Sequence, residues 1–163
     1  GYDEVGIEMY GDKGLAGDMS WYKSADHKPS VVFRPYEPPA QEPSAEFPFW
    51  FCTGRLLEHW HTGTMTRRVE ELDRALPEAL LSMNAEDAAA LGVNDGDMVQ
   101  LTSPHGTMQI KVSLAGRVEP PSGMVFAPFF AAETLINRVV QDYYCPLSKE
   151  TDYKKTCVTI KKA

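Results

Sequence analysis

The sequence predicts a mainly β domain with short helices, in which six or more short strands close into a small barrel. Apolar runs are short and are separated by turns rich in Gly, Pro, Asn and Asp. Helix signals are confined to one or two brief segments. The chain also lacks the Gly-rich dinucleotide fingerprint and the Walker loop, which accompany parallel sheets with crossover helices.

The first half of the predicted barrel starts at the apolar run Phe47–Cys52, which reads as a buried strand. The short apolar segment Pro77–Leu81 suits a strand that closes this half. Asn84 then begins a helix over Ala85–Leu91, because asparagine caps helix N-termini and Gly92 stands where a helix would stop.

The second half begins with Met98–Thr102, which alternates as a strand. Ser103–Gly106 predicts a hairpin turn, and Thr107–Leu114 is the partner strand. The strongly apolar run Gly123–Phe130 is a further strand, and Glu133–Val140 has short helical or loop character. After a turn at Pro146–Lys149, the last strand covers Cys157–Lys161.

Residues 1–46 differ from the rest in composition. They are rich in Gly, Pro, Asp and Glu, and their prolines prevent a regular ladder of strand hydrogen bonds. Only Ser30–Phe33 resembles a short strand. We therefore expect an extended connector over 1–46, partly disordered when isolated, followed by a barrel domain over 47–163.

Composition excludes several classes of function. The formal net charge of −7 argues against general nucleic-acid binding. No apolar run approaches the roughly 18 residues of a membrane span, and the three cysteines lack the spacing of a metal or iron–sulfur site. If the chain is part of a longer protein, a secretory leader would lie upstream of Gly1. The basic residues gather in 53–68 and 138–163, where an anionic ligand would be held.

The segment Thr53–Thr62 carries the most chemical information. It follows the predicted strand Phe47–Cys52 and contains an arginine, two histidines and hydroxyl groups. A strand that ends in a loop of backbone N–H groups, hydroxyls and cations is suited to holding a phosphate.

This segment closely resembles the molybdopterin guanine dinucleotide-binding C-terminal domain of periplasmic nitrate reductases. The resemblance covers roughly residues 31–163, and three further segments carry it: Arg34–Pro39, Pro128–Phe130 with Asn137, and Pro146–Lys155. The stretch Asn84–Val99 is similar to the whole molybdopterin oxidoreductase superfamily. Glu58–His61 and Ser148–Glu150 point to the periplasmic nitrate reductase branch.

The resemblance implies a double-psi β-barrel that is the last domain of a larger catalytic subunit. The whole enzyme would reduce nitrate to nitrite at a molybdenum held by two molybdopterin guanine dinucleotides. A [4Fe–4S] cluster outside this chain would supply electrons from a dihaem cytochrome c partner, after twin-arginine export to the periplasm. The isolated chain, which would contact the other domains of its subunit, is expected to be inactive.

The resemblance also implies the site residues, none of which is catalytic or a metal ligand. Phe129 would lie on the substrate side. The cofactor contacts would be Thr53, Gly54, Arg55, Leu56, Leu57, Glu58, His59, Trp60, His61, Thr62, Asn137 and Lys154. The chemistry agrees, since Arg55 and Lys154 would oppose the negative charge of a diphosphate and Asn137 offers a donor and an acceptor to a heterocycle.

Other interpretations remain open from the sequence alone. His59 and His61 could be surface residues or share a metal, and Arg67 and Arg68 could pair with acidic residues such as Glu70 or Glu71 instead of binding cofactor. The domain could instead belong to an assimilatory nitrate reductase or a formate dehydrogenase. It could also be a stand-alone barrel that binds partner proteins and no cofactor.

Overall fold

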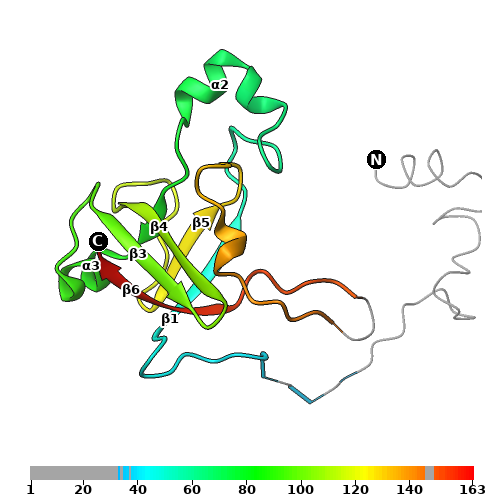
Figure 1. Ribbon diagram of the computed structural model, residues 1–163, viewed down its shortest axis with the longest axis vertical. Coiled ribbons are helices and arrows are strands. Elements are labelled where there is room, and N and C mark those ends of the chain that lie inside the picture. The colour runs from blue at the N-terminus through cyan, green and yellow to red at the C-terminus, as the bar shows by residue number, and fades with distance from the viewer. Residues whose placement is uncertain (1–32, 34, 37, 146–148) are drawn as a thin grey trace, which may run out of the picture. The chain divides into compact units, whose positions relative to one another are not determined.

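The computed structural model describes residues 33, 35–36, 38–145 and 149–163 (Figure 1). The barrel lies in a compact unit that spans Pro38–Ala163. The predicted strand Ser30–Phe33 and the turn Pro146–Lys149 fall largely outside the described residues, and Phe33 itself is not in a strand. The predicted domain boundary at Phe47 stays a prediction.

Six strands form the barrel, and their positions agree closely with the sequence analysis. They are β1 (Phe49–Gly54), β2 (Leu81–Met83), β3 (Met98–Ser103), β4 (Gly106–Ser113), β5 (Met124–Pro128) and β6 (Thr156–Lys162). One prediction is wrong in its bounds: the strand expected over Pro77–Leu81 begins only at Leu81, where pairing with β4 starts, and it pairs with β5 from Ser82 onward. Ala79 is buried although it precedes β2, so the apolar signal before Leu81 came from core packing and not from a strand.

The strands close in the order β1-β5-β2-β4-β3-β6. Two neighbouring pairs are parallel, β1 with β5 and β2 with β4, and every other pair is antiparallel. Exchanging β1, β2 and β3 for β4, β5 and β6 leaves this pairing scheme unchanged, so the two halves are related by a pseudo-two-fold axis. This is the arrangement of a double-psi β-barrel, and the predicted fold class is confirmed.

Alternating side chains fill the barrel interior. In β1 the buried positions are Phe49, Phe51 and Thr53, as expected for a strand with one face on the core. Phe51, Leu81 and Leu101 are each 0% exposed. The same alternation brings the side chain of Thr53 to the inner face at the carboxyl end of β1.

The helices are short, as predicted. In α3 (Ala85–Leu91) the Asn84 side chain accepts a hydrogen bond from the Glu86 N–H, and Gly92 ends the helix in a left-handed conformation. Residues between β1 and β2 form an excursion from the barrel that contains η3 (Thr66–Arg68) and α2 (Glu70–Ala75) (Figure 1). The segment after β5 contains η4 (Ile136–Arg138).

Two described segments outside the strands are held to the barrel by side-chain amides. Gln41 accepts a hydrogen bond from the Cys157 N–H at 3.2 Å and contacts the His105 ring at 2.9 Å. The buried Gln141 donates to the carbonyl oxygen of Asp152 at 2.9 Å, while its backbone N–H donates to Thr156 Oγ1 at 3.0 Å. Gln141 thus fixes the chain that leads into β6.

Candidate functional site

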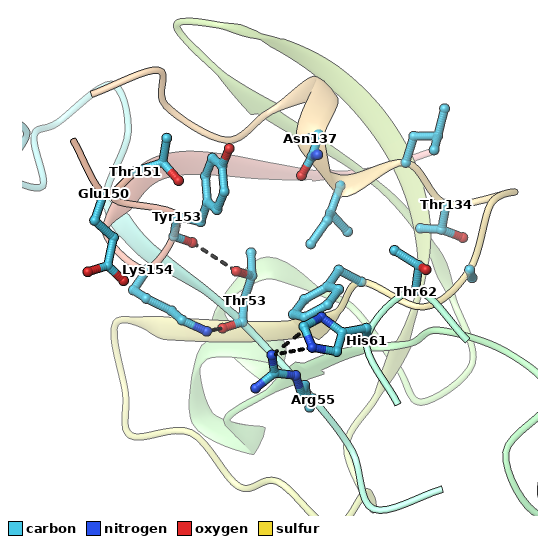
Figure 2. Close-up of a pocket in the computed structure, with 14 residues that line it drawn as sticks. Thr53, Arg55, His61, Thr62, Thr134, Asn137, Glu150, Thr151, Tyr153 and Lys154 are labelled. Carbon is cyan, nitrogen blue, oxygen red and sulfur yellow. Dashed lines mark hydrogen bonds between the residues drawn. The ribbon is translucent and has the colours of Figure 1, made fainter. Parts of the chain in front are cut away.

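A cavity of about 720 Å³ opens at the carboxyl ends of β1 and β5 (Figure 2). Because these two strands are parallel and Gly54 is paired with Pro128, the chain leaves both strands at the same end of the barrel. The walls come from the segments after β1, after β5 and before β6. The lining residues are Thr53, Arg55, His61, Thr62, Phe129, Ala131, Thr134, Leu135, Ile136, Asn137, Glu150, Thr151, Tyr153 and Lys154.

Lys154 and Thr53 are joined at one wall of the cavity. The Lys154 ammonium donates to the carbonyl oxygen of Thr53, and the Thr53 hydroxyl donates to the carbonyl oxygen of Tyr153 at 2.9 Å. These two bonds fasten the chain before β6 to the end of β1, although the residues are about a hundred positions apart. Since the Thr53 proton is already donated, this hydroxyl can offer a ligand only its lone pairs. The neighbouring Lys155 instead pairs with Asp152 at 3.0 Å.

Arg55 lies among aromatic rings at the next wall. Its terminal nitrogen is 3.2 Å and 3.4 Å from the two ring nitrogens of His61. Its guanidinium carbon is 5.4 Å from the ring centre of Trp60 and 5.9 Å from that of Phe129. Cation–π contacts of this kind fix the direction of a guanidinium while leaving most of its N–H groups for other acceptors.

A helical turn presents Asn137 to the cavity from the side opposite Arg55 (Figure 2). Its neighbour Ile136 is 3% exposed and belongs to the hydrophobic core, so η4 is anchored by its apolar residue. The hydroxyl-bearing residues Thr62, Thr134 and Thr151 complete the polar lining. The cavity therefore has a cationic side at Arg55 and Lys154 and an uncharged polar side at Asn137.

The local charge is opposite to that of the whole chain. The lining contains Arg55 and Lys154 against one carboxylate, Glu150, while the chain carries a formal net charge of −7. Such a site favours an anionic group through nearby cations and not through the field of the whole molecule.

Seven of the predicted site residues line this cavity. They are Thr53, Arg55, His61, Thr62, Phe129, Asn137 and Lys154. The other six do not line it. Leu57 and Trp60 are largely exposed to solvent, at 91% and 63%. Leu56 and Glu58 line a separate cavity of about 200 Å³, where Glu58 forms an ion pair with Arg117. Gly54 packs against the ring of Phe126. Their predicted cofactor contacts stay predictions.

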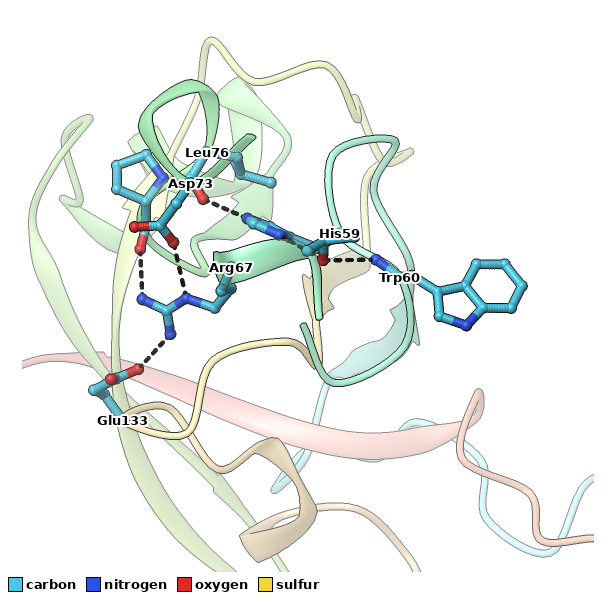
Figure 3. Close-up of polar contacts among 8 residues, drawn as sticks. His59, Trp60, Arg67, Asp73, Leu76 and Glu133 are labelled. Atoms are coloured by element: carbon cyan, nitrogen blue, oxygen red, sulfur yellow. Dashed lines mark hydrogen bonds and ion pairs between the residues drawn. The ribbon is translucent and has the colours of Figure 1, made fainter. Parts of the chain in front are cut away.

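His59, the last of these six, is 2% exposed, and its ring connects separate segments through hydrogen bonds (Figure 3). Its Nε2 is 2.7 Å from the carbonyl oxygen of Leu76, which can only accept, so Nε2 carries the proton. Nδ1 then accepts from the Thr66 hydroxyl at 3.1 Å, and that hydroxyl accepts from the Trp60 N–H at 3.1 Å. The ring also stacks 4.2 Å from Phe130. The sequence marked His59 as important but could not show which way its ring points.

The sequence analysis did not single out seven other lining residues: Ala131, Thr134, Leu135, Ile136, Glu150, Thr151 and Tyr153. Three of them were within reach of sequence reasoning, because Glu150, Thr151 and Tyr153 lie in the segment Pro146–Lys155 that carries the resemblance. The others follow β5, and only the parallel pairing of β5 with β1 brings them to the site.

Within the described residues, no group of three or more His, Cys, Asp or Glu side chains is placed to hold a metal ion. The same part of the chain has no helix that is long and apolar enough to span a membrane.

Comparison with solved structures supports the fold. Acetylene hydratase from Pelobacter acetylenicus matches with a TM-score of 0.68 and 16% sequence identity, over 91% of this chain and 23% of that chain. At this identity the likeness shows the fold alone, and this chain spans about a quarter of that protein's length. Two rationally designed proteins, apDPBB_sym_79 and mkDPBB_sym_86, match with TM-scores of 0.39 and 0.38 and 17% identity, over 71% and 75% of this chain and 94% and 99% of theirs.

The family comparison covers most of the barrel. Residues 49–158 match the family described as "Molydopterin dinucleotide binding domain", from the first strand of the barrel into the last. This range is more than half of the 163 residues, and it contains every residue that lines the cavity at the ends of β1 and β5. The chain therefore belongs to the molybdopterin dinucleotide-binding domain family.

Proposed function

We propose that this domain holds a molybdopterin guanine dinucleotide in the cavity at the ends of β1 and β5, as part of the catalytic subunit of a periplasmic nitrate reductase. One observation carries the first half of the proposal. Seven predicted site residues, which come from segments far apart in the sequence, line a single cavity. Its volume of about 720 Å³ is within the usual range of small-molecule sites.

The donor groups of the cavity suit this cofactor. A dinucleotide carries a diphosphate, and the cavity offers the charged side chains of Arg55 and Lys154 to such an anion. His61, beside Arg55, can add a ring N–H, and the Thr62 hydroxyl can donate as well. Asn137 can pair with the edge of a heterocycle through both its N–H₂ and its carbonyl oxygen.

Each of these residues would bind or orient the cofactor without taking part in bond making. Arg55 is directed by the Trp60 and Phe129 rings, and Lys154 by the Thr53 carbonyl, so both cations are preorganised for an anion. When the cofactor is bound, its molybdenum supplies the redox chemistry. The protein's own contribution in this domain is to neutralise the diphosphate and to fix the position of the rest of the cofactor.

The assignment to a nitrate reductase rests on the sequence segments Thr53–Arg68, Pro128–Phe130 with Asn137, and Pro146–Lys155. On this proposal the enzyme carries two such dinucleotides, a [4Fe–4S] cluster in another domain and a dihaem cytochrome c partner in the periplasm. On the same proposal Phe129, which lies in the cavity wall beside Arg55, would face the substrate side. Nitrate reduction requires the other domains, so the isolated chain should be inactive.

The binding site can be tested with guanosine diphosphate, which carries the diphosphate and the guanine of the proposed cofactor. Titration of the 163-residue chain, followed by amide chemical shifts, should perturb Arg55, His61, Asn137 and Lys154. Arg55→Ala should weaken binding by about ten- to a hundredfold, because a hydrogen bond to a charged group contributes about 1.5–3 kcal/mol.

A matched control is Lys162→Met, which removes an equal charge from an ion pair with Asp97, outside the cavity. Equal affinity of the wild type, Arg55→Ala and Lys162→Met would show that the nucleotide does not bind in this cavity. In the complete enzyme, Arg55→Ala or His61→Ala should lower molybdenum content more than folding stability. Full cofactor loading in both variants would contradict the assigned roles.

A further inference from the structure

Two loops form much of the cavity wall, and they leave different strands. The loop after β1 contributes Arg55, His61 and Thr62, whereas the loop after β5 contributes Phe129, Thr134 and Leu135. Hydrogen bonds between β1 and β5 align the two loops only as far as Gly54 and Pro128. Beyond that point, another interaction must set the distance between them.

Arg67 joins these loops outside the cavity (Figure 3). Its Nε donates to Asp73 Oδ1 at 3.0 Å, on helix α2 of the excursion. One terminal nitrogen donates to Glu133 Oε2 at 3.2 Å, in the loop after β5, and the other lies 3.5 Å from the carbonyl oxygen of Pro77. One guanidinium thus contacts three separate segments, and Figure 3 shows it lying between Asp73 and Glu133.

Gly63 and Phe130 hold the Arg67 side chain in the position from which it makes these contacts. Gly63 has a φ of +72°, and a Cβ at this position would lie 2.9 Å from Arg67 Cγ, so only glycine leaves room for the arginine stem. The Arg67 N–H donates to the Gly63 carbonyl oxygen at 2.8 Å. The guanidinium carbon is 5.9 Å from the ring centre of the buried Phe130, which directly follows the cavity residue Phe129.

Electrostatics agree with a persistent contact. The hydrogen bonds that Arg67 donates to Asp73 and to Glu133 raise the pKa of Arg67, and the negative charge of Glu133 adds to this. The pKa of Glu133 is lowered because its carboxylate accepts hydrogen bonds from its own backbone N–H and from Arg67. The Arg67 side chain is 29% exposed, which is less than half the 70% of Arg74 in its i,i+4 pair with Glu70 on the same excursion.

We propose that Arg67 is a positioning residue for the cavity, which holds the loop after β5 at a fixed distance from the loop after β1 without touching a ligand. The predicted effect on ligand affinity rests on the proposed function. The connection that Arg67 makes between the two loops, called the tie below, does not depend on that function. Removing the guanidinium should release Thr134 and Leu135, because Glu133 is the adjoining residue through which the tie acts.

The test compares Arg67→Met with Arg74→Met in the 163-residue chain. Both variants remove an arginine from the same excursion. In the part of the chain that the structure describes, however, the ion pair of Arg74 is with the exposed Glu70 alone. We expect Arg67→Met to increase amide hydrogen exchange at Thr134 and Leu135 and to weaken guanosine diphosphate binding by roughly three- to thirtyfold. Arg74→Met should leave both quantities at the wild-type level.

Unchanged amide hydrogen exchange at Thr134 and Leu135 in Arg67→Met would overturn the proposal, whether or not the affinity for guanosine diphosphate changes. Increased exchange in a protein that binds no guanosine diphosphate even as wild type would support the tie and count against the proposed ligand. If Arg67→Met fails to fold, Glu133→Gln provides the same test. Its side chain is 73% exposed, so the fold should tolerate it, and it weakens only the contact to the loop after β5. Wild-type exchange in Glu133→Gln would then refute the proposal.

Discussion

Replacing Gly106 with alanine should displace the helical turn that carries Asn137. Gly106 begins β4 in the β3–β4 hairpin, and a Cβ on it would lie well inside 3.0 Å of the carbonyl oxygen of Arg138, the last residue of η4. An ordinary contact between carbon and a carbonyl oxygen is about 3.3 Å or longer. The hairpin and η4 must therefore separate by several tenths of an ångström or more, because the obstacle is backbone and cannot rotate away.

The expected cost follows from packing. Overfilling a closely packed contact costs about 1–3 kcal/mol, which corresponds to a fall in melting temperature of roughly 2–4 °C for each kcal/mol. The same displacement should move Asn137 and weaken guanosine diphosphate binding by up to about tenfold, the value of one neutral hydrogen bond.

Thermal unfolding and amide chemical shifts would measure the two effects separately. Gly92→Ala is the matched control, because Gly92 has a φ of +65° but no atom within 4 Å of its added Cβ. It should cost about 1–2 kcal/mol through backbone strain alone and leave the Asn137 signal in place. The reasoning would be refuted if Gly106→Ala left both the melting temperature and the Asn137 signal unchanged, or if both variants moved that signal equally.

Two other predictions concern stability. The pKa of Asp97 is lowered from 3.8 by its hydrogen bond to Lys162 and by the Asn94 N–H, so its contribution to stability is present above pH 3.8 and is lost as the pH falls through the lower folded-state value. Asp97→Asn should therefore lose less stability than the wild type as the pH falls through this acidic range. Urea unfolding at several pH values measures this, and an unfolding free energy that falls with pH as steeply in Asp97→Asn as in the wild type would contradict the prediction. A truncated chain of residues 45–163 should still unfold cooperatively, but with a loss of about 1–2 kcal/mol because the Gln41 hydrogen bonds to Cys157 and His105 are absent. Non-cooperative unfolding of this truncated chain would refute the predicted boundary near Phe47.

Local signals explain why most elements could be predicted. The Asn84 cap, the Gly92 stop and the turn between Ser103 and Gly106 depend on residues close in sequence, and the structure confirms all three. Strand β2 was misplaced because its length depends on its partners. Leu81–Met83 pair with β4 and β5, whereas the apolar residues just before them only pack against the core.

For the candidate site, too, the sequence indicated some of the residues but not the surroundings of their side chains. The family resemblance marked Arg55, His61 and Lys154 as cofactor contacts, and the chemical type of these side chains agrees with an anionic ligand. The environment of each side chain was not readable, since His59 and His61 are two residues apart and yet one is buried in a hydrogen-bond network and the other lines the cavity. Arg67 shows the same limit. Pairing with acidic residues was one of the interpretations left open by the sequence. The partners are Asp73 and Glu133, and not the sequence neighbours Glu70 and Glu71 that were named as examples.

The sequence by itself determined that the chain forms a mainly β barrel with short helices, and that a cationic, hydroxyl-rich segment follows its first strand. Both properties follow from local periodicity, capping and residue chemistry. Only the tertiary structure decided which residues share the cavity, because the parallel pairing of β1 with β5 and the return of the chain into β6 bring together side chains about a hundred positions apart. Long-range strand pairing has no local signature, so the site could be named in part from the sequence but was assembled by the fold.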